Sequence, residues 1–293
     1  MALVSVILPT RDRPELLPRA LDSLLGQRDV ELEIILVDNN RTAPPLRHFL
    51  GAEPRGQDRR IRLVEAPSVG SAAAARNAGL VVARGEWVAF LDDDDEYHPD
   101  KLARQLALAG QSGASLVLCG AEIRLGSRRR RIQVTKDCFS GDGLLLDAIW
   151  GTPYLFMRRD PGLFFDPALQ AGEDLVFAQD YIRRHGINRV PNVAAPLVTV
   201  HPQPGVRVNL NAAAHWQAAK RVLHPRPDHY SSQARRRFFW RMRLQTCKAP
   251  AVPWRRLFAT GFRLLRVGGI AESRRVLNAW LQRAGWFRRW LVS

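Results

Sequence analysis

Short apolar runs alternate with longer amphipathic segments through the first 120 residues of the chain. Each run holds four or five mostly apolar residues, which predicts a buried strand. The runs are Val4–Leu8, Ile34–Val37, Ile61–Val64, Trp87–Leu91 and Leu116–Cys119. Leucines at helical spacing after the first run, and an Ala-rich segment at Ser71–Ala83, predict helices between the strands. Such alternation is typical of an α/β fold with a mostly parallel, doubly wound sheet.

Acidic side chains follow three of the predicted strands. Asp12, Asp38 and Asp92–Asp95 each lie just past a strand end. Because the carboxyl ends of parallel strands meet at one edge of a sheet, we expect these acids to face a common cleft. Asp12 and Glu15 also have the spacing of a capping box, which predicts that the first helix starts there.

The four adjacent aspartates Asp92–Asp95 are the strongest chemical signal in the sequence. Their carboxylates repel one another unless a cation or bulk water surrounds them, and hard divalent cations prefer such oxygen ligands. One interpretation is a metal site at the end of the Trp87–Leu91 strand. The other is a solvated acidic turn that caps the next helix.

Positive charge is concentrated toward the C-terminal end of the chain. The 293 residues include 44 Lys and Arg against 28 Asp and Glu, but residues 1–206 are nearly balanced. Residues 207–293 hold 19 of the basic residues and only two acidic ones, Asp228 and Glu272. We therefore expect a catalytic-sized domain at 1–206 and a basic helical region at 207–293 that meets polyanions.

The basic region has an amphipathic helical pattern. Trp254, Leu257, Phe258 and Phe262 fall on one helix face, with arginines elsewhere. This pattern favours contact with an anionic membrane surface, an acidic acceptor or another copy of the chain. The alternative is that the apolar faces pack on one another or on the first domain. Nucleic acid is disfavoured as a partner because the region contains no base-reading motif.

The sequence also bears on the cellular compartment. Three scattered cysteines are too few for a disulfide framework or a four-thiolate zinc site, so we expect a reducing compartment. No apolar stretch is long enough to span a membrane, and Met1–Thr10 lacks the pattern of a signal peptide. We expect a cytoplasmic protein, peripheral on the inner face of the plasma membrane if the basic helices bind lipid.

Four motifs, taken in order, resemble those of the family-two glycosyltransferases. They are Val4–Arg13, Ile35–Asn40, Gly70 with Ala75–Gly79, and Gly85–Asp95. Farther along, Gly172–Asp174 resembles the acidic catalytic motif of that family, and Val200–His201 resembles its late histidine. The resemblance covers about two-thirds of the chain and stops before the basic region. It implies a Rossmann-like fold of the GT-A type, with the C-terminal helices as an appendage.

The resemblance also implies a nucleotide-sugar pocket. Its residues would be Pro9, Thr10, Asp12, Asp38, Ser68, Arg76, Asp92, Asp93 and Glu173. Asp38 resembles the acid that accepts a hydrogen bond from the base, usually uracil, and Arg76 resembles the basic residue near the base and diphosphate. Asp92 and Asp93 would hold ribose or sugar hydroxyls. Ser68 departs from the family, since many relatives have Asn there.

A metal and a general base are implied in the same way. Asp94 would coordinate Mn²⁺ or Mg²⁺, His201 would supply a second metal or phosphate contact, and Asp174 would be the general base. The chemistry needs two acidic groups, because a cation must stabilise the leaving diphosphate on one side of the sugar while a carboxylate deprotonates the acceptor on the other. Asp94 and Asp174 belong to acidic groups 80 residues apart in sequence, which suits these two roles. A single cluster could not stand on both faces of the sugar.

We therefore expect a metal-dependent, inverting glycosyltransferase that moves a sugar from a nucleotide sugar, UDP-linked, to an acceptor hydroxyl in the synthesis of a cell-surface glycan. Two alternatives stay open at this point. One is a non-catalytic protein of the same fold that binds membranes or anionic polymers through residues 207–293. The other is a nucleotidyltransferase, which would release pyrophosphate in place of UDP.

Overall fold

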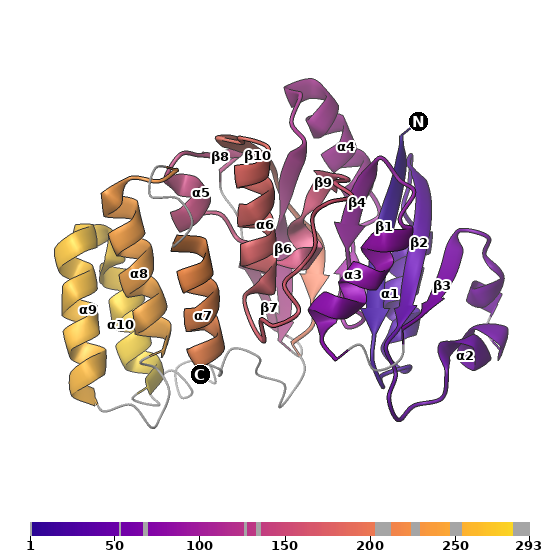
Figure 1. Cartoon of the computed structure of the whole chain (residues 1–293), viewed down its shortest axis with the longest axis horizontal. Coiled ribbons are helices and arrows are strands. Elements are labelled where there is room, and N and C mark those ends of the chain that lie inside the picture. The colour runs from indigo at the N-terminus through magenta and orange to yellow at the C-terminus, as the bar shows by residue number, and fades with distance from the viewer. Residues whose placement is uncertain are drawn as a thin grey trace.

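Figure 1 shows a computed structural model of the chain, coloured from the N-terminus to the C-terminus. The described residues are 2–52, 54–66, 70–125, 128–132, 136–202, 212–223, 229–246 and 254–283. Ser68, which the sequence assigns to the nucleotide pocket, lies outside them.

Four parallel strands form the N-terminal half of the sheet, in the order β3-β2-β1-β4. They are β1 (Leu3–Thr10), β2 (Glu31–Asp38), β3 (Ile61–Glu65) and β4 (Trp87–Phe90). Their side chains are apolar on both faces because helices cover both faces, which is why the sequence shows continuous apolar runs and not alternation. All four predicted strands are confirmed here, within three residues at each end.

The second half of the sheet is mixed. Strand β9 (Phe156–Arg158) joins the two halves, since it pairs antiparallel with both β4 and β6 (Leu116–Leu125). Strand β10 (Arg189–Val200) runs parallel to β6, and β5 (Glu96–Tyr97) pairs antiparallel with β10. Two short strands, β7 (Arg128–Ile132) and β8 (Cys138–Ser140), add antiparallel pairs at the side. The expected α/β class is confirmed.

Helices lie on both faces of the sheet, and alternate residues of β1 point to opposite cores. Val6 and Leu8 pack with the leucines of α1 (Leu17–Leu25) in one core, which also contains α2 (Leu46–Ala52) and the start of α4 (Lys101–Ser112). The opposite core is built around Ile7. It contains side chains of α3 (Ala72–Val82), the short α5 (Gly143–Leu146) and α6 (Glu173–Arg184). This two-sided packing fixes the strand ends that carry the acids.

The C-terminal helices form a layer beside α6 (Figure 1). They are α7 (Ala212–Leu223), α8 (Ser232–Thr246), α9 (Trp254–Gly268), the 3₁₀ turn η4 (Gly269–Glu272) and α10 (Ser273–Arg283). Helix α7 and the first part of α8 join the core that α6 lines. The pair α9–α10 closes a separate small core around Leu257, Leu264 and Val276. The boundary at residue 206 stays a prediction.

None of the helices described, from α1 to α10, combines the length and apolar character needed to cross a bilayer. The expected cytoplasmic placement stays a prediction.

The predicted capping box at Asp12 is wrong. Helix α1 begins at Leu17, and no side chain caps it. The Asp12 carboxylate instead accepts hydrogen bonds from the backbone N–H groups of Arg41, Thr42 and Ala43, at 2.8–2.9 Å. These bonds hold the pKa of Asp12 far below its usual range. Asp12 therefore joins the loop after β1 to the loop after β2, an interaction that sequence spacing does not reveal.

Gly79 sets the distance between α3 and the sheet. A Cβ atom at this position would lie 2.5 Å from Cγ2 of Ile7 and 3.3 Å from Cγ2 of Val37, both fully buried. We expect Gly79→Ala to lower the free energy of unfolding by roughly 1–3 kcal/mol through overpacking. Gly110→Ala in α4 is the matched control, because its Cβ would meet nothing within 4 Å. Helix propensity predicts a gain of about 0.5–1 kcal/mol for that control. Equal and stabilising effects in chemical denaturation would contradict the close approach.

Candidate active site

A cavity of about 790 Å³ opens at the carboxyl ends of β1 and β4. Its wall is built from strand ends on one side and from the start of α6 on the other. The lining includes Pro9, Thr10, Arg13, Asn39, Arg76, Asp92, Asp93, Asp94, Asp95, Tyr154, Glu173, Asp174 and His201. The structure thus brings together both acidic groups that the sequence places 80 residues apart.

Asp93 and Asp94 share one arginine. Arg13 donates to Oδ1 of Asp93 at 2.5 Å and to Oδ2 of Asp94 at 3.4 Å, while the Thr10 hydroxyl donates to Oδ2 of Asp93 at 2.7 Å. Burial raises the pKa of Asp93 to about 6, even though Thr10 and Arg13 oppose that change. Burial, followed by the charge of Asp92, also raises the pKa of Asp94. The charge of Arg13 therefore does not fully offset the effect of burial on the pKa values of Asp93 and Asp94.

Asp95 contacts the end of β10 and not the Thr10 and Arg13 side chains that bind Asp93. Its Oδ1 atom accepts a hydrogen bond from the backbone N–H of His201 at 3.0 Å. Burial and the charges of Asp92 and Asp94 raise its pKa to about 8. The His201 ring lies beside the next acid, with Nε2 2.5 Å from Oε1 of Glu96. Because this pair engages Nε2, a metal contact by His201 would use Nδ1, and the role stays a prediction.

Arg76 joins the two acidic groups across the cavity. Its side chain is almost completely buried, and it donates to Oδ1 of Asp92 at 2.6 Å and to Oε1 of Glu173 at 3.1 Å. Burial alone would lower the pKa of this guanidinium, but the charges of Asp92 and Glu173 outweigh burial and raise the pKa. The Phe165 ring also lies 5.6 Å from the guanidinium carbon. Arg76 is thus a fixed cation between the strand end and α6.

Asp174 stands at the first turn of α6 and lines the same cavity as the acids that follow β4. Gly172 precedes the helix with φ +75°, a conformation that suits glycine and turns the chain into α6. The Asp174 carboxylate accepts a hydrogen bond from the backbone N–H of Leu175 at 2.7 Å. Burial, followed by the charge of Glu173, raises its pKa to about 7. A carboxyl group poised near neutrality has the proton affinity that general-base chemistry needs.

Two of the expected pocket residues do not line the cavity. Asp38 accepts hydrogen bonds from the backbone N–H groups of Asn40 and Leu46, at 3.0 and 2.7 Å, and Asp12 is engaged with the neighbouring loop. Asn39 lines the cavity where Asp38 was expected. Its side chain is 2% exposed, and its Oδ1 atom has no hydrogen-bond partner within the described parts of the chain. Sequence reasoning missed Asn39, because a strand end does not reveal which of two adjacent polar residues turns inward.

Tyr154 and Gln170 also line the cavity without having been expected. Tyr154 closes the 3₁₀ turn η2 (Thr152–Tyr154), which lies between the two acidic groups in sequence. Its carbonyl accepts a hydrogen bond from the buried Gln105 of α4 at 3.2 Å. No motif marks either residue, since they come from an irregular segment with no periodic pattern.

The acids of β4 fit a divalent cation, although they do not form a complete cage. Among the described residues, no three His, Cys, Asp or Glu side chains converge as a ligand set. Mg²⁺ and similar cations are commonly held by one or two carboxylates together with substrate phosphates, and keep several waters. Asp92, Asp93 and Asp94 line the cavity together, and Arg13 is the cation that contacts Asp93 and Asp94. Asp94 is therefore a suitable single carboxylate ligand.

Comparison with known proteins connects this cavity to a family. Residues 5–170 match the family model described as glycosyl transferase family 2. ExoO, a succinoglycan biosynthesis protein of Rhizobium meliloti, is 31% identical over 191 residues, which are 59% of this chain and 53% of ExoO. AmsB, an amylovoran biosynthesis glycosyltransferase of Erwinia amylovora, is 36% identical over 105 residues, 36% of this chain and 35% of AmsB. The matched part of this chain thus spans about half the length of ExoO and about a third of the length of AmsB.

The fold has a close counterpart among solved structures. The crystal structure of S. aureus TarS 1-349 in complex with UDP-GlcNAc superimposes with a TM-score of 0.66, covering 97% of this chain and 88% of the TarS chain. At 17% sequence identity, this likeness establishes the fold and nothing more. The expected GT-A architecture with C-terminal helices is therefore confirmed, and with a family model that matches more than half of its residues, the chain belongs to glycosyl transferase family 2.

Proposed function

We propose that this chain is a metal-dependent, inverting glycosyltransferase that uses a UDP-sugar and acts in cell-surface polysaccharide synthesis. The observation that carries the proposal is the pairing of Asp94 and Asp174 across one cavity, with Arg76 between their groups. Two kinds of relative support the biological setting. ExoO and AmsB are named for succinoglycan and amylovoran biosynthesis, and the TarS crystal contains UDP-GlcNAc.

The donor is proposed to lie along the strand ends. The free amide oxygen of Asn39 is an acceptor suited to the imino N–H of uracil. Asp92 and Asp93 have carboxylate oxygens for sugar or ribose hydroxyls, and Arg13 and Arg76 place positive charge where a diphosphate would lie. Mn²⁺ or Mg²⁺ held by Asp94 would act as a Lewis acid on the diphosphate oxygens.

The transfer step is proposed to be a single displacement. Asp174 accepts the proton of the acceptor hydroxyl as the new bond forms from that oxygen to the anomeric carbon. The bond from the anomeric carbon to the diphosphate oxygen breaks, and its electron pair leaves on the nucleoside diphosphate. Because attack and departure take place on opposite faces of the sugar, the anomeric configuration inverts. The Asp174 pKa of about 7 supports this role, because a general base is most effective when its pKa lies near the working pH.

The pH dependence follows from the state that Asp174 must have. Only its ionised form accepts a proton, and its pKa is raised to about 7. We expect the rate of transfer at saturating donor to fall about tenfold per pH unit below that value and to level off above it. UDP release, followed in a coupled assay across pH, measures the profile. If the rate stays constant between pH 5 and 8, a range that begins about two units below the pKa of about 7, Asp174 is not the base.

Asp174→Asn should lower the rate of UDP release by about 10²–10⁴-fold, because the amide accepts no proton. The matched control is Asp180→Asn on the same helix, where the carboxylate pairs with Arg183 away from the cavity. That variant should keep the rate of the unaltered chain. Release of pyrophosphate in place of UDP would indicate the nucleotidyltransferase alternative.

Metal binding can be tested without turnover. UDP with Mn²⁺ should raise the thermal midpoint of the unaltered chain, since a ligand that binds only the folded state stabilises it. Asp94→Asn should weaken the Mn²⁺-dependent part of this shift by roughly tenfold or more in apparent affinity. Glu65→Gln, which removes an exposed acid paired with Arg47, is the control. If Mn²⁺ adds nothing to the UDP shift in any of the three chains, the proposed metal dependence is wrong.

Asn39 provides a separate test of base recognition. Asn39→Leu keeps the branching of the side chain but removes the buried acceptor, so the Kd for UDP should rise about tenfold. Asn39→Asp keeps an oxygen at the same place and should retain most of the affinity. Isothermal titration measures both values. Equal affinity in Asn39→Leu and the unaltered chain would place the base elsewhere.

A further inference from the structure

The apolar stripe predicted on α9 divides in the folded chain. Leu257 and Leu264 turn inward and pack with Val276 and Ala279 of α10, which completes the small core of this helix pair. Phe258 and Phe262 do not enter that core. They are 40% and 61% exposed, so only part of the predicted apolar face packs against the rest of the chain.

The exposed phenylalanines belong to an apolar patch that crosses both helices. Trp280 of α10 contacts both of them, with ring centroids 5.0 Å from Phe258 and 5.7 Å from Phe262. Leu277 lies one helical turn before Trp280 on the same side of α10 and is 52% exposed. We refer to Phe258, Phe262, Leu277 and Trp280 as the α9–α10 patch. Large apolar side chains gathered on a surface mark an interaction site more often than single ones do.

Arginines flank the patch along α9. Arg255, Phe258, Phe262 and Arg266 follow one another at i, i+3, i+7 and i+11, so they form a single stripe on the helix. Both of these arginines are exposed. Neither α9 nor α10 contains an acidic residue. The stripe therefore presents aromatic rings between cations, with no anion on either helix to neutralise them.

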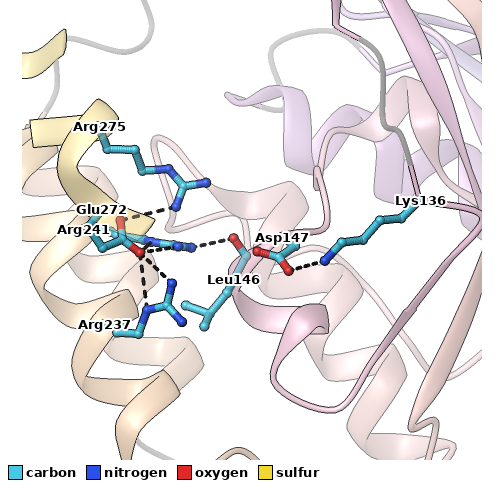
Figure 2. A network of polar contacts seen from close by, with 7 residues as sticks. All are labelled: Lys136, Leu146, Asp147, Arg237, Arg241, Glu272 and Arg275. Carbon is cyan, nitrogen blue, oxygen red and sulfur yellow. Dashed lines mark hydrogen bonds and ion pairs between the residues drawn. The ribbon is translucent and has the colours of Figure 1, made fainter. Parts of the chain in front are cut away.

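The acidic residue that joins these helices is hidden from this surface. Glu272 is fully buried, and its carboxylate pairs with Arg237, Arg241 and Arg275 (Figure 2). Arg241 also donates to the backbone carbonyl of Leu146 in α5 at 2.6 Å. The helix pair is thereby fixed to the main domain, and Glu272 does not reduce the positive potential outside.

We propose that the α9–α10 patch docks on an anionic lipid bilayer. Aromatic side chains of amphipathic helices insert at the headgroup level, while neighbouring arginines attract acidic lipids. A second copy of the chain fits less well, because a symmetric contact would bring arginine against arginine without compensating acids. The proposal concerns where the enzyme works and is independent of the reaction proposed above.

Co-sedimentation of the full chain with vesicles tests this. We expect binding to phosphatidylcholine vesicles that contain phosphatidylglycerol, no binding to pure phosphatidylcholine, and loss of binding in high salt, where the Debye length shrinks to about 3 Å. Phe262→Ser should weaken binding about tenfold, since that ring would no longer be buried in the interface. Arg266→Gln should weaken binding to the anionic vesicles about fivefold, because one cation that attracts acidic lipids is lost.

The matched control is Phe164→Ser, which removes another phenylalanine that is 44% exposed but lies outside the α9–α10 patch. It should bind as the unaltered chain does. Thermal unfolding checks that all variants fold, and UDP release to water should be the same for Phe262→Ser and the unaltered chain. Equal binding by all variants, binding to neutral vesicles, or dimerisation through Phe262 without vesicle binding would each overturn the proposal.

Discussion

A single buried cation, Arg76, determines how the two parts of the cavity are held together. It comes from α3, and its guanidinium contacts Asp92 after β4 and Glu173 at the start of α6. A buried charge is costly unless it is paired, so Arg76 depends on these two acids for its compensation. Conversely, without Arg76 the acids on the two sides would repel one another. The pair of contacts therefore fixes α6, and with it Asp174, opposite the β4 acids.

The cavity still holds more negative charge than its own arginines neutralise. Burial raises the pKa of Asp93, Asp95 and Asp174 to about 6, 8 and 7, even with Arg13 and Arg76 present. Positive charge from a bound cation would relieve this repulsion, whereas a proton does so in its absence. The same electrostatic condition that favours a metal beside Asp94 keeps Asp174 basic enough to accept a proton. One arrangement of charge thus supports both halves of the proposed reaction.

The helical region has the opposite charge and a different task. Its buried acid, Glu272, pairs with three arginines, and one of them, Arg241, also donates to α5, so this ion-pair cluster attaches the helices to the main domain (Figure 2). Arg255 and Arg266 are exposed on α9, and neither α9 nor α10 contains an acidic residue. This positive surface is in keeping with the bilayer contact proposed above.

The amino-acid sequence by itself determined the strand and helix order and the collection of acids at one edge. These follow from local apolar runs and from the rule that parallel strands present their carboxyl ends together, which is why Asp94 could be assigned to the cleft. Arg76 and Asp174 were assigned to it only through the resemblance to family-two glycosyltransferases. Tertiary structure decided the rest. It turned Asn39 and not Asp38 toward the cavity, bound Asp12 to a neighbouring loop, and left Phe262 on the surface beside a buried Leu264. Each of those outcomes depends on a partner distant in sequence, and periodicity along the chain contains no information about which partner a side chain meets.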